Sequence, residues 1–130
     1  MEDKRKKILL VEDDNDMRAT LKDRLFRVYQ VLEASDGEQA ITVCLDHRPD
    51  LIVLDMLLPK LDGFKVLERI RNFPDQSIAS IHVVVLSNLY SQKDILQVQG
   101  LKIDQYFVKS HTKIEDVVKK IDEIIGELPN

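Results

Sequence analysis

Short apolar runs alternate along the chain with segments in which apolar residues recur at helical spacing. Five of the runs predict β-strands, at about residues 7–11, 29–33, 51–54, 81–86 and 105–108. Five other segments predict helices: one capped by Asn15 or Asp16, one at about 38–46, one opened by Asp62 and Gly63, then 91–101 and 114–128. The last helix has the most regular apolar face, and residues 91–101 are only weakly amphipathic.

Strands that alternate with helices in this way indicate a parallel sheet with helices on both faces. The runs are continuously apolar, as expected for parallel strands, because both of their faces are buried. Right-handed crossovers leave few topologies, and we expect an α/β, flavodoxin-like, doubly wound (βα)5 fold with a parallel five-stranded sheet in the order 2-1-3-4-5. In that order the first and third strands are neighbours, so their carboxyl ends meet.

Composition adds several exclusions. The 130 residues suffice for one domain, with its core at about 7–126 and no output domain after it. The net charge of -4 argues against nucleic-acid binding through bulk electrostatics. A single cysteine, Cys44, excludes an internal disulfide and fits a reducing compartment. The first apolar run is too short for a signal peptide and nothing approaches a membrane span, so we expect a soluble cytoplasmic domain.

Charged residues of complementary kinds follow three of the predicted strands. Glu12, Asp13 and Asp14 follow the first strand, Asp55 follows the third, and Lys109 follows the fifth. Each has an ordinary structural explanation, because acids favour helix N-termini and turns, and lysine is common at surfaces. On strand ends that the fold brings together, however, clustered carboxylates and one lysine indicate a site for Mg²⁺ and a phosphoryl group.

Four motifs resemble those of the receiver domain of two-component response regulators, in particular the stand-alone chemotaxis type. They are Val11-Glu12-Asp13-Asp14, Asp55 with Pro59 and Asp62-Gly63, Leu86-Ser87-Asn88, and Tyr106-Phe107-Val108-Lys109. The resemblance extends from Ile8 to about Ile125, which is nearly the whole chain. It implies a phosphorylatable switch in a two-component phosphorelay.

The resemblance also implies roles for the site residues. Asp55 would be the phosphoacceptor, because an aspartate can attack phosphorus and form an acyl phosphate. A Mg²⁺ cofactor would be held by Asp13, Asp55 and the backbone carbonyl of Leu57, with Glu12 acting through a bound water. A domain of this kind is no ordinary enzyme, since it catalyses only its own phosphorylation and dephosphorylation.

Lys109 and Ser87 would contact phosphoryl oxygens in the same scheme. The resemblance implies that Ser87 then moves toward the phosphoryl group and Tyr106 rotates inward. This repacks the face formed by the fourth helix, fifth strand and fifth helix, which a downstream protein target reads. The phosphoryl donor would be a sensor histidine kinase or a histidine phosphotransfer protein, docked on the first helix around Met17, Arg18 and Leu21. Direct contact with nucleic acid or a membrane is not expected.

Several positions depart from the family pattern. Ser110 stands where proline usually follows the lysine, so the Lys109–Ser110 bond is either trans with a rearranged loop or cis at a cost of about 2.5–4 kcal/mol. Asn88 replaces a very small residue and could crowd the phosphoryl group. Lys102 stands at a usual glycine position, which leaves the end of the helix at 91–101 open.

Two apolar residues, Leu57 and Leu89, flank the site where many family members have polar ones. Our hypothesis is that they exclude hydrolytic water and prolong the phosphorylated state. Leu57→Asn and Leu89→Glu variants should then lose the phosphoryl group faster, and unchanged or slower autodephosphorylation would reject the idea.

Other classes of function remain open. A pseudo-receiver would bind partners without phosphorylation, and only Ser110 and Asn88 support it. A small phosphatase or phosphotransferase could use Asp55 as its nucleophile, but Leu57 stands where haloacid-dehalogenase-like enzymes place a second acid. A flavin-binding flavodoxin would leave the acidic cluster unexplained.

Overall fold

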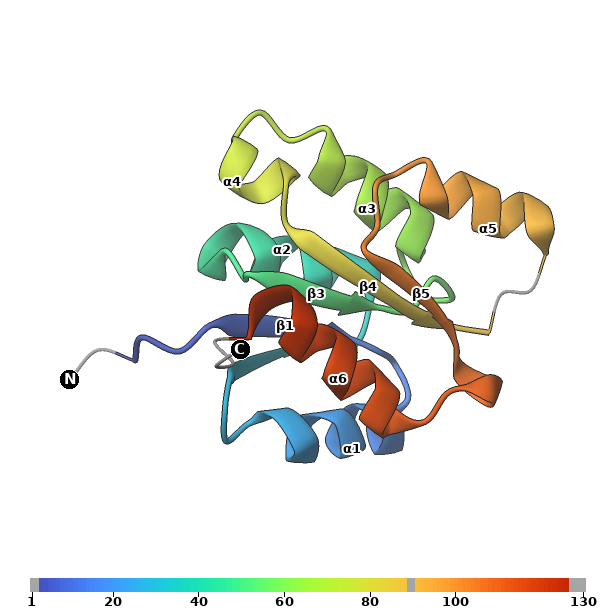
Figure 1. The fold of residues 1–130 in the computed structure, drawn as a ribbon. Helices are drawn as coiled ribbons and strands as arrows, with labels where there is room; N and C mark the ends of the chain where they lie inside the picture. Colours follow the sequence, from blue (N-terminus) through green and yellow to red (C-terminus); the bar gives the residue numbers. More distant parts are fainter. Residues whose placement is uncertain (1–2, 89–90, 127–130) are drawn as a thin grey trace.

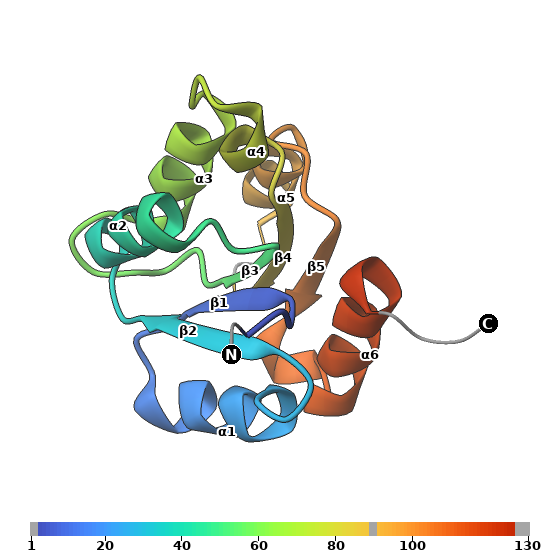
Figure 2. The same ribbon diagram turned by 90° about the vertical axis from the view of Figure 1, so that its left-hand side faces the viewer.

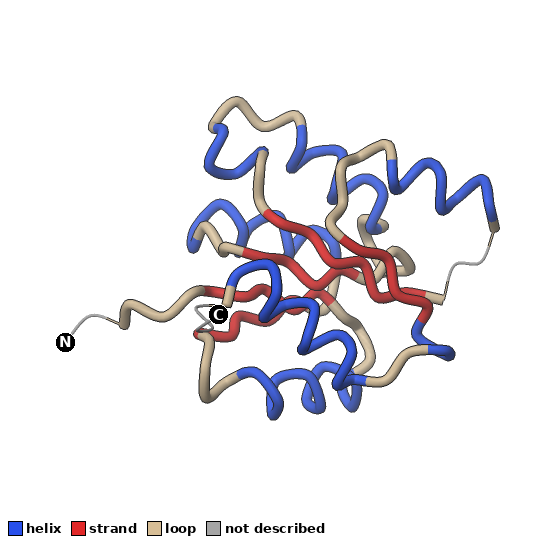
Figure 3. Tube along the Cα trace, in the orientation of Figure 1, coloured by secondary structure: helices blue, strands red, loops and turns tan. Residues whose placement is uncertain are grey.

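The computed structural model describes residues 3–88 and 91–126, which form a five-stranded sheet flanked by helices. The strands are β1 (Lys7–Val11), β2 (Gln30–Ala34), β3 (Leu51–Leu54), β4 (His82–Ser87) and β5 (Gln105–Val108). Neighbouring strands are parallel and follow the order β2-β1-β3-β4-β5, so the predicted fold is confirmed. Figure 3 shows the strands as a central layer with helical segments on either side.

The helices divide between the two faces of the sheet (Figures 1 and 2). One face is covered by α1 (Asn15–Leu25) and α6 (Ile114–Ile125). The other is covered by α2 (Gly37–His47), α3 (Gly63–Arg71), α4 (Gln76–Ala79) and α5 (Gln92–Gln99). A 3-10 turn, η1 (Lys109–His111), follows β5. The predicted fourth and fifth helices are therefore α5 and α6.

Each face has its own apolar core, and the alternation of side chains along the strands creates both. In β3, Ile52 and Leu54 pack with α2, α3 and α5, while Leu51 and Val53 pack with α1 and α6. All four are buried, which explains why this strand is apolar throughout. The two cores hold the sheet in place, and with it the strand ends that form the site.

Helix starts differ slightly from the sequence prediction. The cap of α1 is Asp14 and neither Asn15 nor Asp16: the Asp14 carboxylate accepts hydrogen bonds from the backbone N–H groups of Asp16 and Met17. Asp14 thus has the helix-capping role that an acidic turn suggests. The predicted start of α3 is confirmed, because Asp62 caps it by accepting a hydrogen bond from Lys65 N–H.

Other boundaries need correction. The short helix α4 was not predicted, and β2 and β4 each lie one residue further along the chain than expected. Helix α5 ends at Gln99 with Gly100 as its cap, and Lys102 adopts a left-handed backbone with φ 59°. Residues 127–128 of the predicted last helix lie outside the described residues.

One side-chain placement was wrong. Leu21, expected to contribute to a docking surface on α1, is 1% exposed and lies in the core shared with α6. Within the described ranges no peptide bond is cis, so the Lys109–Ser110 bond is trans. Among these residues no helix combines the length and the apolar character needed to cross a bilayer.

Candidate functional site

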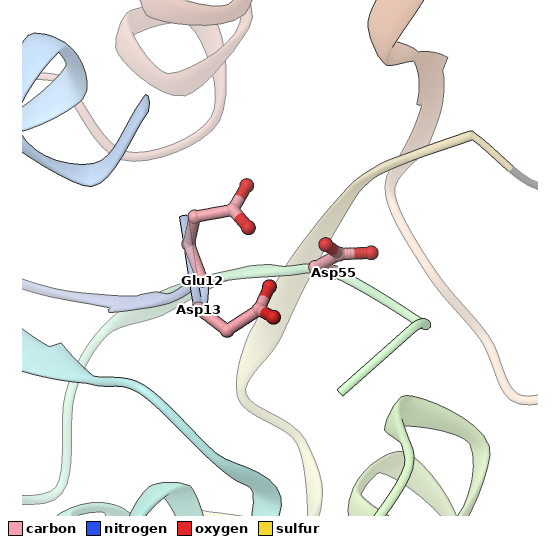
Figure 4. Close-up of side chains that lie close together, drawn as sticks. All are labelled: Glu12, Asp13 and Asp55. Carbon is pink, nitrogen blue, oxygen red and sulfur yellow. The ribbon is translucent and has the colours of Figure 1, made fainter. Parts of the chain in front are cut away.

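The carboxyl ends of β1 and β3 bring three carboxylates together. Val11 pairs with Leu54 in these neighbouring strands, so the residues that follow emerge side by side. One carboxylate oxygen from each of Glu12, Asp13 and Asp55 lies within 4.8 Å of the others. Figure 4 shows Glu12 and Asp13 on the chain after β1, with Asp55 across from them after β3. The predicted convergence of these acids is thus observed.

The three carboxylates differ in their exposure to water. Glu12 and Asp55 are 3% and 5% exposed, whereas Asp13 faces solvent. Burial raises the pKa of Glu12 to about 7; the hydrogen bond from Lys109 opposes this rise and the negative charge of Asp55 adds to it. The site therefore holds buried negative charge that a cation must compensate.

Lys109 supplies part of that compensation from the end of β5. Its Nζ lies 2.6 Å from Glu12 Oε1 and 2.8 Å from Asp55 Oδ2, so one ammonium group donates to two carboxylates. Burial alone would lower the pKa of Lys109, but the hydrogen bonds to Asp55 and Glu12 outweigh it and raise that pKa. Lys109 is therefore held in its charged form between the two buried acids.

Ser87 approaches the other oxygen of Asp55 from the end of β4. Its hydroxyl is fully buried and donates to Asp55 Oδ1 at 2.8 Å, while its oxygen accepts a 3.3 Å hydrogen bond from Met56 N–H. The Leu57 N–H also donates to Asp55 Oδ1, at 3.0 Å. Donors from three directions thus set the orientation of the Asp55 carboxylate.

The remaining predicted site residues lie near this centre in different settings. Leu57 is 55% exposed, and its own N–H contacts the Asp55 carboxylate. Tyr106 is half-buried on β5 and packs against the core shared by α2, α3 and α5. Leu89, the second apolar residue thought to flank the site, lies outside the described residues.

Arg18 on α1 contributes to the site in a way that the sequence did not reveal. Its guanidinium donates to the backbone carbonyl of Glu12 at 2.7 Å, and also to the side chains of Asn15 and Glu33. It therefore ties α1 to the acidic loop and to β2. An arginine six residues after an acid is an ordinary feature of an exposed helix, so the spacing carried no signal for this contact.

These residues fit a Mg²⁺ ion by their donor chemistry. Each of Glu12, Asp13 and Asp55 offers a hard carboxylate oxygen, the donor type that Mg²⁺ prefers. When all three are ionised, three negative charges and the one positive charge of Lys109 leave two negative charges uncompensated. A divalent cation would balance them.

Comparisons with known proteins agree with the fold. The chain matches the response regulator receiver domain over residues 8–122 and belongs to this family. It is 38% identical over 110 residues to the probable transcriptional regulator ycf27 of Cyanophora paradoxa, a match that covers 84% of this chain and 44% of that protein. Its acidic cluster is consistent with the Mg²⁺ that receiver domains commonly bind.

Two solved structures are similar over almost the full chain. The phosphorylated cyanobacterial phytochrome response regulator RcpA is 33% identical, with a TM-score of 0.79 and 92% of each chain covered. The Mn(2+)-bound form of response regulator Rcp1 is 29% identical, with a TM-score of 0.80 and coverage of 96% and 97%. The chain spans about half the length of the ycf27 proteins that it matches, 44% and 54% in two cases.

Proposed function

We propose that this receiver domain is a phosphorylatable switch and that Asp55 is its phosphoacceptor. The observation that carries the proposal is the pair of contacts on Asp55: Lys109 donates to one carboxylate oxygen and Ser87 to the other. Phosphoryl transfer depends mainly on positioning and charge stabilisation, and these two donors supply both. The similarity to RcpA, which is described as phosphorylated, supports the same function.

The reaction follows from the chemistry of a carboxylate. An Asp55 oxygen attacks the phosphorus of a phosphohistidine, the new O–P bond forms, and the N–P bond breaks, leaving the imidazole on the donor. Glu12, Asp13, Asp55 and the backbone carbonyl of Leu57 would hold Mg²⁺, which supplies charge neutralisation when bound. The Lys109 ammonium and the Ser87 hydroxyl then stabilise the phosphoryl oxygens.

We further propose that phosphorylation shifts the equilibrium between two conformational states of the domain and that partner proteins recognise the resulting surface. The added phosphoryl group binds better to the state in which Ser87 contacts it and Tyr106 packs inward. The face formed by α5, β5 and α6 then changes and binds a downstream protein target. We propose that the domain acts in the cytoplasm, without direct contact to nucleic acid or membrane.

The donor would be a sensor histidine kinase or a histidine phosphotransfer protein that docks on α1. Met17 and Arg18 are partly accessible on this helix, whereas Leu21 is buried and is therefore excluded from the docking surface. Because Arg18 also contacts the carbonyl of Glu12, a partner on α1 would lie close to the acidic cluster.

The deciding experiment is intact-mass measurement after incubation with Mg²⁺ and acetyl phosphate. We expect one added phosphoryl group on the wild type and on Asp16→Asn, a control in the exposed first turn of α1. We expect none on Asp55→Asn or without Mg²⁺. If the wild type acquires no adduct from acetyl phosphate or from a phosphohistidine donor, with rapid hydrolysis excluded, the domain is a pseudo-receiver and the proposal fails.

A further inference from the structure

The two loops that carry Ser87 and Lys109 are joined by a hydrogen bond next to the site. Asn88 follows Ser87, Ser110 follows Lys109, and the Ser110 N–H donates to Asn88 Oδ1 at 3.0 Å. The last registered pair between β4 and β5 is Ser87 with Val108. The Asn88–Ser110 contact therefore links the loops beyond the point where the sheet itself holds them.

This contact closes a ring around the Asp55 carboxylate. From Asp55 Oδ1 the ring passes through the Ser87 hydroxyl to Asn88, across to Ser110, and back through Lys109 to Asp55 Oδ2. Every link is either a covalent connection or a hydrogen bond of 2.8–3.0 Å. The separation between the Ser87 hydroxyl and the Lys109 ammonium is thus constrained twice, by their shared contact with Asp55 and by the Asn88–Ser110 hydrogen bond.

We propose that Asn88 is a positioning residue for phosphoryl transfer, which holds the two phosphoryl-contacting donors at a set separation through its bond to Ser110. The inference rests on the proposed function of Asp55. When a phosphoryl group is attached, Ser87 and Lys109 must exchange their contacts with the Asp55 oxygens for contacts with phosphoryl oxygens. The Asn88–Ser110 bond does not involve Asp55, so it persists through the reaction and limits how far the donors separate.

The same hydrogen bond connects two departures from the family pattern, Asn88 and Ser110. A proline at position 110 would have no N–H to donate, so the Asn88 acceptor has this partner only because position 110 is not proline. The Asn88 side-chain oxygen is turned toward the Ser110 N–H. Positioning and crowding make opposite predictions for a shorter side chain at position 88.

The test compares Asn88→Ala and Asn88→Leu with the wild type, using acetyl phosphate at a fixed concentration and a range of Mg²⁺ concentrations. Leucine keeps the bulk of asparagine but has no acceptor. We expect both variants to be phosphorylated about three- to tenfold more slowly at saturating Mg²⁺, because the donors lose their alignment. The Mg²⁺ concentration for half-maximal rate should stay within about twofold, since Asn88 is outside the carboxylate cluster. Asn72→Ala, at the end of α3, is the matched control and should react as the wild type does.

A double-mutant cycle with Ser110→Pro identifies the route of the effect. Asn88→Ala should cause little further loss in the Ser110→Pro background, where the N–H donor is already absent. A faster Asn88→Ala variant would overturn the inference in favour of crowding, and so would rates equal to the wild type or a full additional loss in the double mutant. If the wild type itself acquires no phosphoryl group, the proposed function and this inference both fail. Equal rates for the wild type and Asn88→Ala would instead reject only the inference about Asn88.

Discussion

At the scale of single residues, the site is defined by charge that is buried and only partly compensated. Two carboxylates, Glu12 and Asp55, share one ammonium group, Lys109. Removing a carboxylate from water is costly unless it is paired, and two acids with a single cation leave one of them underpaired. The effect is seen at Glu12, because burial is the main cause that raises its pKa to about 7.

This shift predicts how the stability of the metal-free protein depends on pH. The pKa of Glu12 is higher in the folded state than its unperturbed value of 4.5, so the folded state binds this proton more tightly. Its contribution to the free energy of unfolding is therefore complete below about pH 4.5 and is lost as the pH rises through about 7. The loss should be on the order of 3 kcal/mol, because the pKa rises from 4.5 to about 7 and each pKa unit corresponds to about 1.4 kcal/mol.

Urea denaturation in the presence of a chelator, between pH 5 and pH 8, measures the effect. Glu12→Gln should remove this component of the pH dependence and make the metal-free protein more stable at pH 8. Glu68→Gln, an exposed position on α3, serves as the control and should follow the wild type. Identical pH profiles for Glu12→Gln and the wild type would contradict the prediction.

At the scale of secondary-structure elements, the sequence located each described strand to within one residue but missed the shortest α-helix. The strand β3 was located to the residue because parallel strands buried on both faces must be apolar throughout. The four-residue helix α4 was missed because so short a segment shows no helical periodicity. Asp75 caps its single turn locally, and Ile78 packs that turn into the core, a tertiary contact that a pattern along the chain does not contain.

Arg71 is a second feature that periodicity could not predict. It occupies the last position of α3, where a basic residue is usually explained by the helix dipole. Its half-buried guanidinium instead donates to four backbone carbonyls, those of Ala79 and Ile81 before β4 and of Leu101 and Lys102 before β5. One side chain thereby joins α3 to the segments that enter two strands.

We expect Arg71→Met to lower the free energy of unfolding by about 2–4 kcal/mol, because several carbonyls lose a charged donor while the apolar part of the side chain is kept. Arg71→Lys should recover only part of this, since an ammonium group lacks the planar fork that reaches both segments. Urea denaturation checks both variants against Arg69→Met, an exposed position on the same helix. Equal stability of the methionine variants at positions 69 and 71 would refute the role.

At the scale of the whole molecule, the site exists only because four strand ends meet at one edge of the sheet. The acids after β1 and β3, Ser87 at the end of β4 and Lys109 after β5 lie far apart in sequence. The strand order 2-1-3-4-5 was enough to predict that Glu12, Asp13 and Asp55 converge. It could not predict that Lys109 bridges two acids or that Asn88 contacts Ser110, because these contacts depend on rotamers and loop paths.

The convergence of charge should link Mg²⁺ binding to the stability of the entire fold. Unfolding separates Asp55 from the adjacent residues Glu12 and Asp13, so Mg²⁺ should bind the folded state far better than the unfolded one. At a Mg²⁺ concentration about 100 times its dissociation constant, this linkage stabilises the folded protein by about 2.7 kcal/mol. For a domain of this size, that corresponds to a rise in melting temperature of roughly 10 °C.

Thermal denaturation with increasing MgCl₂, matched in ionic strength with NaCl, tests this linkage. Asp13→Asn should remove most of the Mg²⁺-dependent rise, because it deletes one of the three clustered carboxylates. It should not destabilise the metal-free protein, because Asp13 is exposed and its removal relieves repulsion between like charges. Asp16→Asn should keep the full rise. If Asp13→Asn and the wild type gain equally from Mg²⁺, the stabilising ion is bound elsewhere, and the carboxylate cluster is not the metal site.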